Sequence, residues 1–286
     1  MTNPEYFTPK SVAEAIPLLL QYGGESRIIA GGTDLLVQMK NKMALPDFLI
    51  NIGGISDLKY INYDAISGIN IGALTTIDAI EDSSLIQSKF GVLAQAAGSL
   101  GTAAIRNKAT IGGNLCNAAP SADTAPVLMV LGATVKIAGI DGEKIVAIED
   151  FFTGPGQTVV KPGELLLEIQ IPDRPLHSGA AYLKQKRRQG SDIAVAGVAA
   201  SVVMEGEILR DVKIALGAVA PTPIRAKKAE ETLKGKKLDD RLLEESGQAA
   251  SRQAKPVDDT RSSADYRRKL VAILVKRAVR QAVEQA

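Results

Sequence analysis

The stretch Thr110–Asp123 reads TIGGNLCNAAPSAD, and it decides how the rest of the chain is interpreted. It holds an adjacent glycine pair, two asparagines, a proline and an aspartate. A run of that composition cannot form one regular helix or strand throughout. It is either an ordinary turn or a loop shaped to bind a ligand, and the stretch alone leaves both readings open.

An earlier segment, IIAGGTDLL at residues 28–36, repeats the design with a second glycine pair. Adjacent glycines allow positive φ and a close backbone approach to a ligand, and consecutive N–H groups form an anion-binding nest. Thr33 or Asp34 could cap the helix that follows, whose N-terminus adds partial positive charge. Two such turns together suit a pyrophosphate, the centre of a dinucleotide. Asp123 would then accept a hydrogen bond from a ribose hydroxyl, or else cap a helix beginning at Thr124.

The usual nucleotide signatures are missing from the sequence. It contains no G-x-G-x-x-G after the first predicted strand and no G-x-x-x-x-G-K-[ST]. A bound dinucleotide would therefore not be held in the Rossmann or P-loop manner.

Composition excludes several classes of protein. The 286 residues are 45% hydrophobic and 23% charged, which is ordinary for a globular protein of about two domains. A net charge of +2 with dispersed basic residues argues against nucleic acid as a partner. No apolar run is long enough for a membrane span, and the N-terminus lacks the apolar core of a signal peptide, so we expect a cytoplasmic protein.

Single copies of cysteine and histidine limit the chemistry further. Cys116 alone cannot form an internal disulfide or a thiolate cluster, and His177 lies in the Pro-flanked stretch DRPLHSG, which reads as a linker. We therefore expect no metal site and no catalytic residue, and a chain that works through a bound organic cofactor or a partner. We interpret Cys116 as a small buried residue without a redox role.

Periodicity along the chain predicts an α+β fold. Apolar or alternating runs predict strands that include 47–52, 68–77 and 164–172, with a helix giving way to a strand over 125–139. Residues 173–178 are the expected boundary, and three strands follow it, two of them joined by the turn MEGEI at 204–208. Helical spacing is found at 11–23, 83–100, 223–235, 239–253 and 263–285.

Five segments together resemble the flavoprotein (medium) subunit of the molybdenum hydroxylases, the family of carbon monoxide dehydrogenase and bacterial xanthine dehydrogenase. The resemblance runs from Phe7 to the final helix, and the two glycine loops carry most of its specificity. The segments are IIAGGTDLLVQMK, IRNKATIGGNLCNAAPSADTAPVLMVLGA, FFTGPGQTVVKPGELLLEIQIP, YLKQKRRQGSDIAVAGVAASV and LGAVAPTPIRAKKAEETLKGK.

The resemblance implies a two-domain architecture. Residues 1–175 would form a vanillyl-alcohol-oxidase-like (PCMH-type) FAD-binding domain of two α/β subdomains, about 1–55 and 56–175. Residues 178–286 would form a domain like the C-terminal domain of carbon monoxide dehydrogenase flavoprotein. That domain is expected to contain a three-stranded antiparallel sheet packed with helices.

The resemblance also implies which residues bind FAD. Asp123 would take a ribose or ribityl hydroxyl near the adenine half. Leu166 would flank the cofactor, or else belong to the sheet core, and Lys184 would reach the flavin ring edge, or else be an exposed strand lysine. The two loops would contribute Ala30, Gly31, Gly32, Thr33, Asp34, Leu35, Thr110, Gly112, Gly113, Asn114, Asn117 and Ser121.

The implied function is electron transfer. A large molybdenum-cofactor subunit would oxidise the substrate, a small subunit with two 2Fe-2S clusters would relay electrons to this FAD, and NAD, a quinone or ferredoxin would accept them. Thr33-Asp34 in the first loop favours a xanthine, heterocycle or aldehyde dehydrogenase over a carbon monoxide dehydrogenase. The alternatives are a stand-alone FAD oxidoreductase of the same fold and a non-catalytic nucleotide-binding assembly protein.

Overall fold

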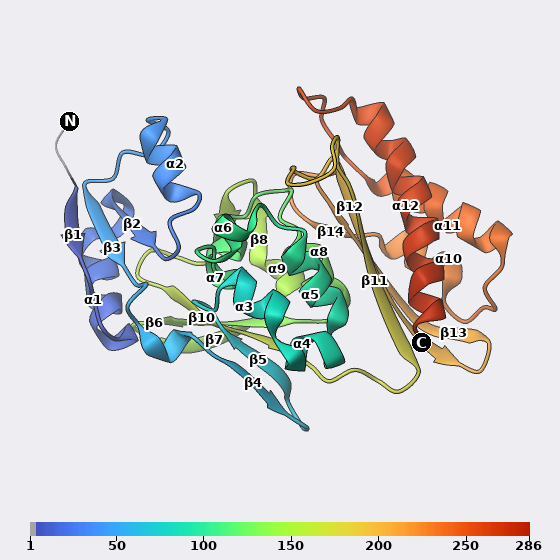
Figure 1. Ribbon diagram of the computed structural model, residues 1–286, viewed down its shortest axis with the longest axis horizontal. Coiled ribbons are helices and arrows are strands. Elements are labelled where there is room, and N and C mark those ends of the chain that lie inside the picture. The colour runs from blue at the N-terminus through green and yellow to red at the C-terminus, as the bar shows by residue number, and fades with distance from the viewer. Residues whose placement is uncertain (1–3) are drawn as a thin grey trace.

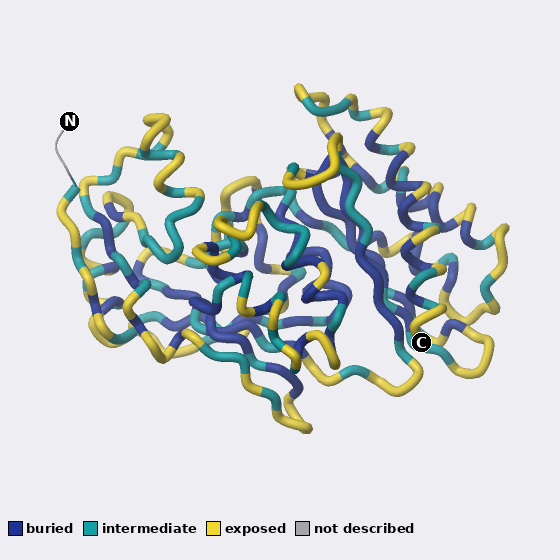
Figure 2. Tube along the Cα trace, viewed as in Figure 1, coloured by how far each residue is buried: buried dark blue, intermediate teal, exposed yellow. Residues whose placement is uncertain are grey.

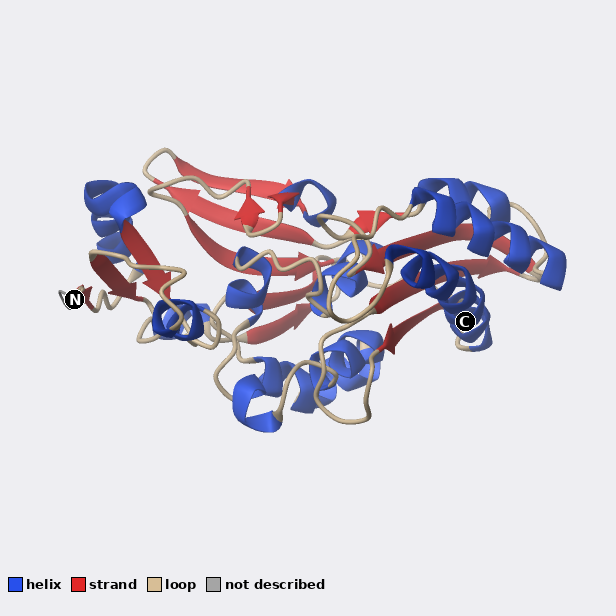
Figure 3. Ribbon diagram, turned by 90° about the horizontal axis from the view of Figure 1, so that it is seen from above, coloured by secondary structure: helices blue, strands red, loops and turns tan. Residues whose placement is uncertain are grey.

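The computed structural model describes residues 4–286 (Figure 1). Three sheets follow one another along the long axis, with the two ends of the chain far apart (Figures 1 and 3). The first is a small parallel sheet in the order β1-β3-β2. The elements of this part are β1 (Glu5–Phe7), α1 (Val12–Tyr22), η1 (Gly23–Glu25), β2 (Ser26–Ile29), α2 (Leu35–Lys40), β3 (Phe48–Asn51) and η2 (Ser56–Leu58).

Helix α1 explains why the small sheet is stable. Ser11 caps it by accepting from the Glu14 amide, and Ala15 and Leu19 are buried on one face. They pack with Ile50 of β3 in a core that is separate from the central one. The predicted strand–glycine–helix order of this region is confirmed, since β2 ends before the glycine pair and α2 begins after it.

The second sheet is antiparallel, in the order β4-β5-β10-β6-β7. Its last strand in sequence, β10, lies at the centre between β5 and β6. The strands are β4 (Ile61–Asp64), β5 (Gly68–Gly72), β6 (Thr134–Gly139), β7 (Gly142–Ala147) and β10 (Leu165–Ile171), with a separate pair β8 (Phe152–Gly154) and β9 (Gln157–Thr158). The helices are α3 (Ile77–Asp82), α4 (Ser84–Lys89), α5 (Gly91–Gly98), α6 (Ala103–Arg106), α7 (Ile111–Cys116), α8 (Thr124–Val130) and α9 (Ile148–Phe151).

The single helix predicted over 83–100 is wrong, because the structure breaks it into α4 and α5. Phe90 stands at the break with φ −136° and ψ 44°, and its side chain is fully buried. Turning the backbone there places the aromatic ring in the core, and Gly91 opens the next helix.

The third sheet is antiparallel, in the order β11-β12-β13-β14. It therefore has four strands and not the predicted three. The extra strand is the dipeptide Ile224–Arg225, which pairs with Leu216 and Ala215 and does not belong to the helix that the spacing over 223–235 predicts. The elements are β11 (Ser178–Gln185), β12 (Ala196–Glu205), β13 (Ile208–Gly217), β14 (Ile224–Arg225), α10 (Lys227–Leu233), α11 (Asp240–Gln253) and α12 (Ala264–Glu284).

An ion-pair network explains why the chain stays extended at β14. Arg225 contacts Glu149 of α9 with one nitrogen, and its Nε donates to Glu230 Oε1 at 2.7 Å. The same Glu230 oxygen accepts from the Ile214 amide. Helix α12 covers β11 and β12, where the burial colouring shows long dark runs (Figure 2). No helix between residues 4 and 286 has the length and apolar character needed to cross a membrane.

Candidate cofactor-binding site

The first glycine loop joins β2 to α2 and presents free backbone donors. The N–H groups of Gly31, Gly32, Thr33 and Asp34 meet no hydrogen-bond acceptor anywhere in residues 4–286. Gly32 has φ +73°, a conformation that favours glycine. Gly31, Gly32 and Thr33 are half-buried and Asp34 is exposed, and backbone amides without an internal partner are suited to an anion.

The two glycine loops lie against each other, as predicted. A Cβ on Gly31 would stand 1.8 Å from the carbonyl oxygen of Lys108, directly before the second loop. Beyond it, Gln38 Nε2 of α2 donates to Asn117 Oδ1 at 3.4 Å. The absence of a side chain at Gly31 therefore allows the backbones of the two loops to meet.

The second glycine pair does not form the open nest that was predicted. It lies in α7, where the Gly112 amide donates to Ala73 O at 2.9 Å and the Gly113 amide to Thr110 Oγ1 at 3.1 Å. The Asn114 amide donates to Thr110 O. Neither glycine has positive φ, so the expectation of left-handed backbone here is wrong. A glycine is needed at position 112 for another reason, because a Cβ there would lie 2.7 Å from both the Cβ and the carbonyl oxygen of Ala73.

The rest of the second loop closes between α7 and α8. Asn114 Oδ1 accepts from the buried Thr124 hydroxyl at 2.6 Å, and Ser121 is half-buried. Ala118 adopts φ +46° at the bend.

Cys116 is exposed, so its interpretation as a buried residue is wrong. His177 lies exposed in the connection between β10 and β11, in agreement with its assignment to a linker.

Asp123 and Lys184 form a buried ion pair, with Lys184 Nζ 2.8 Å from Asp123 Oδ2. The same nitrogen donates to Ser99 O at 3.0 Å, and the Tyr182 hydroxyl donates to Asp123 Oδ1 at 2.7 Å. Two alternatives are therefore wrong: Lys184 is not an exposed lysine, and Asp123, although it precedes α8, makes no capping bond with its side chain. The two side chains therefore lie in direct contact.

Burial controls the protonation of this cluster. Burial raises the pKa of Asp123, and the nearby Lys184 and Tyr182 oppose that rise. Burial and the neighbouring carboxylate raise the pKa of Tyr182 well above its ordinary value, so its hydroxyl keeps the proton that it donates. Tyr182 was not among the predicted site residues. The signal was its spacing of two from Lys184, which places both side chains on the same face of a strand.

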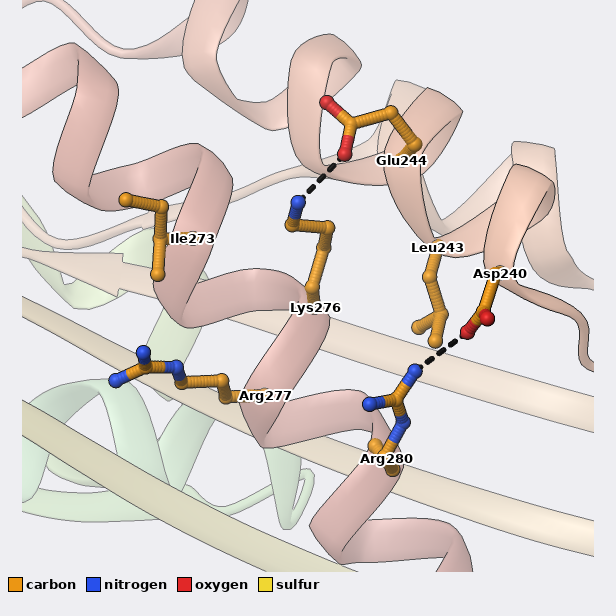
Figure 4. A pocket seen from close by; sticks show the side chains of 7 residues that line it. All are labelled: Asp240, Leu243, Glu244, Ile273, Lys276, Arg277 and Arg280. Carbon is orange, nitrogen blue, oxygen red and sulfur yellow. Dashed lines mark hydrogen bonds and ion pairs between the residues drawn. The ribbon is translucent and has the colours of Figure 1, made fainter.

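Leu166 lies in β10 opposite Ile137 and is 3% exposed within the central core. Elsewhere, α11 and α12 form a surface groove lined by charged residues of both signs (Figure 4). Lys276–Glu244 and Arg280–Asp240 ion pairs bridge it, at 2.5 and 2.6 Å. This groove lies at the other end of the molecule from the first glycine loop (Figure 1), so it is not part of the predicted site.

Two known families match consecutive parts of the chain. Residues 2–174 match the family described as "FAD binding domain in molybdopterin dehydrogenase", and residues 181–282 match the "CO dehydrogenase flavoprotein C-terminal domain". The chain therefore belongs to the FAD-binding medium subunits of the molybdenum hydroxylases, and it is a flavoprotein subunit of a molybdenum-containing oxidoreductase.

Individual relatives match over nearly their whole length. The carbon monoxide dehydrogenase medium chain of Afipia carboxidovorans is 36% identical, covering 99% of this chain and 97% of the relative. The glyceraldehyde dehydrogenase medium chain of Sulfolobus acidocaldarius is 34% identical (98% and 99%), and the xanthine dehydrogenase FAD-binding subunit of Escherichia coli O157:H7 is 31% identical (98% and 96%). A solved carbon monoxide dehydrogenase from Hydrogenophaga pseudoflava matches with a TM-score of 0.96 at 35% identity, covering 100% of this chain and 99% of that one.

Proposed function

We propose that this chain carries FAD as the electron-transfer subunit of a multi-subunit molybdenum hydroxylase. The observation that carries the proposal is the first glycine loop, whose four successive amides have no acceptor within residues 4–286 and which abuts the second loop. In this proposal residues 1–175 are the FAD-binding domain, residues 178–286 are the C-terminal domain, and the protein works in the cytoplasm.

Several parts of the chain would contact FAD. The amides of Gly31 to Asp34 would bind the pyrophosphate, with Ala30 and Leu35 flanking them, and α7 would support the other side through its backbone. Asp123 and Lys184 lie in contact, which favours a ribityl hydroxyl over the adenine ribose as the group that Asp123 binds. The remaining proposed contacts are Thr110, Gly112, Gly113, Asn114, Asn117, Ser121 and Leu166. FAD supplies the redox chemistry when bound, and the chain positions it and tunes its electrostatics.

Partners are part of the proposal. The relatives named above are medium chains or FAD-binding subunits, which supports assembly with a large molybdenum-cofactor subunit and a small subunit with two 2Fe-2S clusters. The relatives named above serve carbon monoxide, glyceraldehyde and xanthine dehydrogenases. Because the first loop contains Thr33-Asp34, we favour a complex that acts as a xanthine, heterocycle or aldehyde dehydrogenase. NAD, a quinone or ferredoxin would be its electron acceptor.

The test is to purify the chain from its native source and measure its flavin. We expect oxidised-flavin absorbance, FAD released on denaturation, and two co-purifying subunits that contain molybdenum and iron. A colourless protein that cannot be reconstituted with FAD would contradict the proposal. Turnover of a small substrate by the isolated chain would favour a stand-alone oxidoreductase, and partner binding without redox cycling would favour an assembly protein.

A further inference from the structure

Tyr182 is a buried tyrosine, 3% exposed, beside two proposed FAD ligands. Its hydroxyl and the Lys184 ammonium each contact one oxygen of the Asp123 carboxylate, at 2.7 and 2.8 Å. We propose that Tyr182 is a positioning residue of the flavin site, which fixes the Asp123 carboxylate, and through it Lys184, in the orientation that FAD requires. This inference rests on the proposed function.

The strand β11 brings the two donors together. Tyr182 and Lys184 are two residues apart, so their side chains leave the same face of the strand, and both reach the start of α8. Because each carboxylate oxygen receives its own donor, the carboxylate is held at both ends and cannot turn freely. Without the tyrosine hydroxyl, one oxygen of a buried carboxylate would lose its side-chain donor, which is costly in a buried site.

The neighbouring strand makes room for this arrangement. Gly197 of β12 pairs with Lys184, and a Cβ on Gly197 would lie 2.9 Å from the Tyr182 hydroxyl oxygen and 3.4 Å from its Cε2. The tyrosine ring therefore lies across a position where β12 has no side chain. Gly197 thus permits the hydroxyl to sit where the Asp123 carboxylate can accept from it.

The cluster also spans the proposed domain boundary. Asp123 and Ser99 belong to the N-terminal part, whereas Tyr182 and Lys184 belong to the C-terminal part, and all four meet through Lys184 Nζ and the Asp123 carboxylate. Tyr182 therefore lets the C-terminal sheet set the geometry of a group that the N-terminal part contributes to the cofactor.

The experiment measures FAD affinity in the full chain by titrating apoprotein with FAD. We expect Tyr182→Phe to raise the dissociation constant for FAD about tenfold, the effect of losing one charge-assisted hydrogen bond. The matched control is Tyr63→Phe, which removes a hydroxyl that donates to Asp173 Oδ2 at 3.0 Å at the edge of the central sheet. The control is expected to bind FAD as the wild type does.

A double-mutant cycle separates positioning from general stability. In an Asp123→Ala background, Tyr182→Phe is expected to change FAD affinity by less than about twofold, because no carboxylate oxygen remains to accept from the hydroxyl. An equal loss in both backgrounds would overturn the inference. If Tyr182→Phe does not fold, Gly197→Ala replaces it in the test. The added methyl group would displace the Tyr182 hydroxyl without removing it. Unchanged FAD affinity in Gly197→Ala would also overturn the inference.

Failure of the inference is distinct from failure of the proposed function. Wild-type chain that takes up no FAD contradicts the proposed function itself. Wild-type chain that takes up FAD, with Tyr182→Phe binding it equally well, contradicts only the role of Tyr182. The reduction potential of the bound flavin gives a second measure, because a shift in Tyr182→Phe and none in Tyr63→Phe is expected from a changed position of the Lys184 charge.

Discussion

Gly31 has no room for a side chain, and this single fact connects the two loops of the site. The carbonyl oxygen of Lys108 occupies the space where a Cβ would stand, at 1.8 Å. A backbone that approaches so closely cannot adjust without moving one loop away from the other. The free backbone amides of Gly32 to Asp34 would then shift relative to α7.

Gly31→Ala should therefore abolish most FAD binding and destabilise the fold by about 1–3 kcal/mol, the usual cost of overpacking. Flavin content after purification and the free energy of unfolding in urea measure the two effects. Gly24→Ala is the matched control, because a Cβ there has no neighbour within 4 Å. Full flavin loading in Gly31→Ala would mean that the contact between the loops is not needed for the site.

The elements show which features the sequence could predict. The first glycine loop was predictable because its strand, its turn and its helix are local in sequence. The second loop was not, because the Gly112 amide donates to the carbonyl oxygen of Ala73, far away in the chain. The strand at Ile224–Arg225 was missed for the same reason, since Arg225 forms an ion pair with the distant Glu149 of α9. Periodicity detects which residues are apolar, but not which distant groups satisfy a particular donor.

The connection between α11 and α12 carries a prediction about pH. Asp259 Oδ1 accepts from the Arg261 and Ser262 amides and from the buried Arg267, at 2.8, 3.1 and 2.7 Å. Partial burial opposes ionisation of Asp259, but the Arg261 amide and the Arg267 guanidinium outweigh it and hold the pKa of this carboxyl below its ordinary value. Arg267 in turn donates to the carbonyl oxygens of Val195 and Ala218, so the carboxylate supports the end of the C-terminal sheet.

A carboxyl group with a lowered pKa in the folded state stabilises the fold above its ordinary pKa of about 4, and that contribution is lost as the pH falls through the folded value. We therefore expect the wild type to lose more free energy of unfolding than Asp259→Asn between about pH 7 and about pH 3. Urea denaturation at several pH values measures the difference. Asp141→Asn, in an exposed turn between β6 and β7, should follow the wild type; identical slopes for all three proteins would contradict this role of Asp259.

At the scale of the whole molecule, the proposed site joins the three sheets. The first loop follows a strand of the small sheet, the second loop lies between helices of the central part, and Lys184 comes from the C-terminal sheet. Side-chain contacts already connect the parts, through Asp123 with Lys184 and through Glu149 with Arg225. A cofactor bound by all of these groups would stabilise the molecule as one cooperative unit.

FAD should therefore raise the melting temperature of the entire chain. At a free FAD concentration one hundred times the dissociation constant, the expected stabilisation is about 2.7 kcal/mol. Scanning calorimetry of apoprotein with and without FAD measures it. FMN is the matched control, because it lacks the pyrophosphate that the Gly31–Asp34 amides would bind, and it should shift the transition less. A transition that splits, with one part unmoved by FAD, would contradict a site shared by all three sheets.

The central place of β10 has a consequence for how the chain is made. Strands β5 and β6 flank it, yet both leave the ribosome before it does. A growing chain that ends before Leu165 holds two half-sheets with unpaired inner edges, and only the arrival of β10 closes them. Because the missing strand cannot be supplied locally, this region must wait for translation to pass residue 171, and in that interval its open edges are exposed to aggregation and to chaperones.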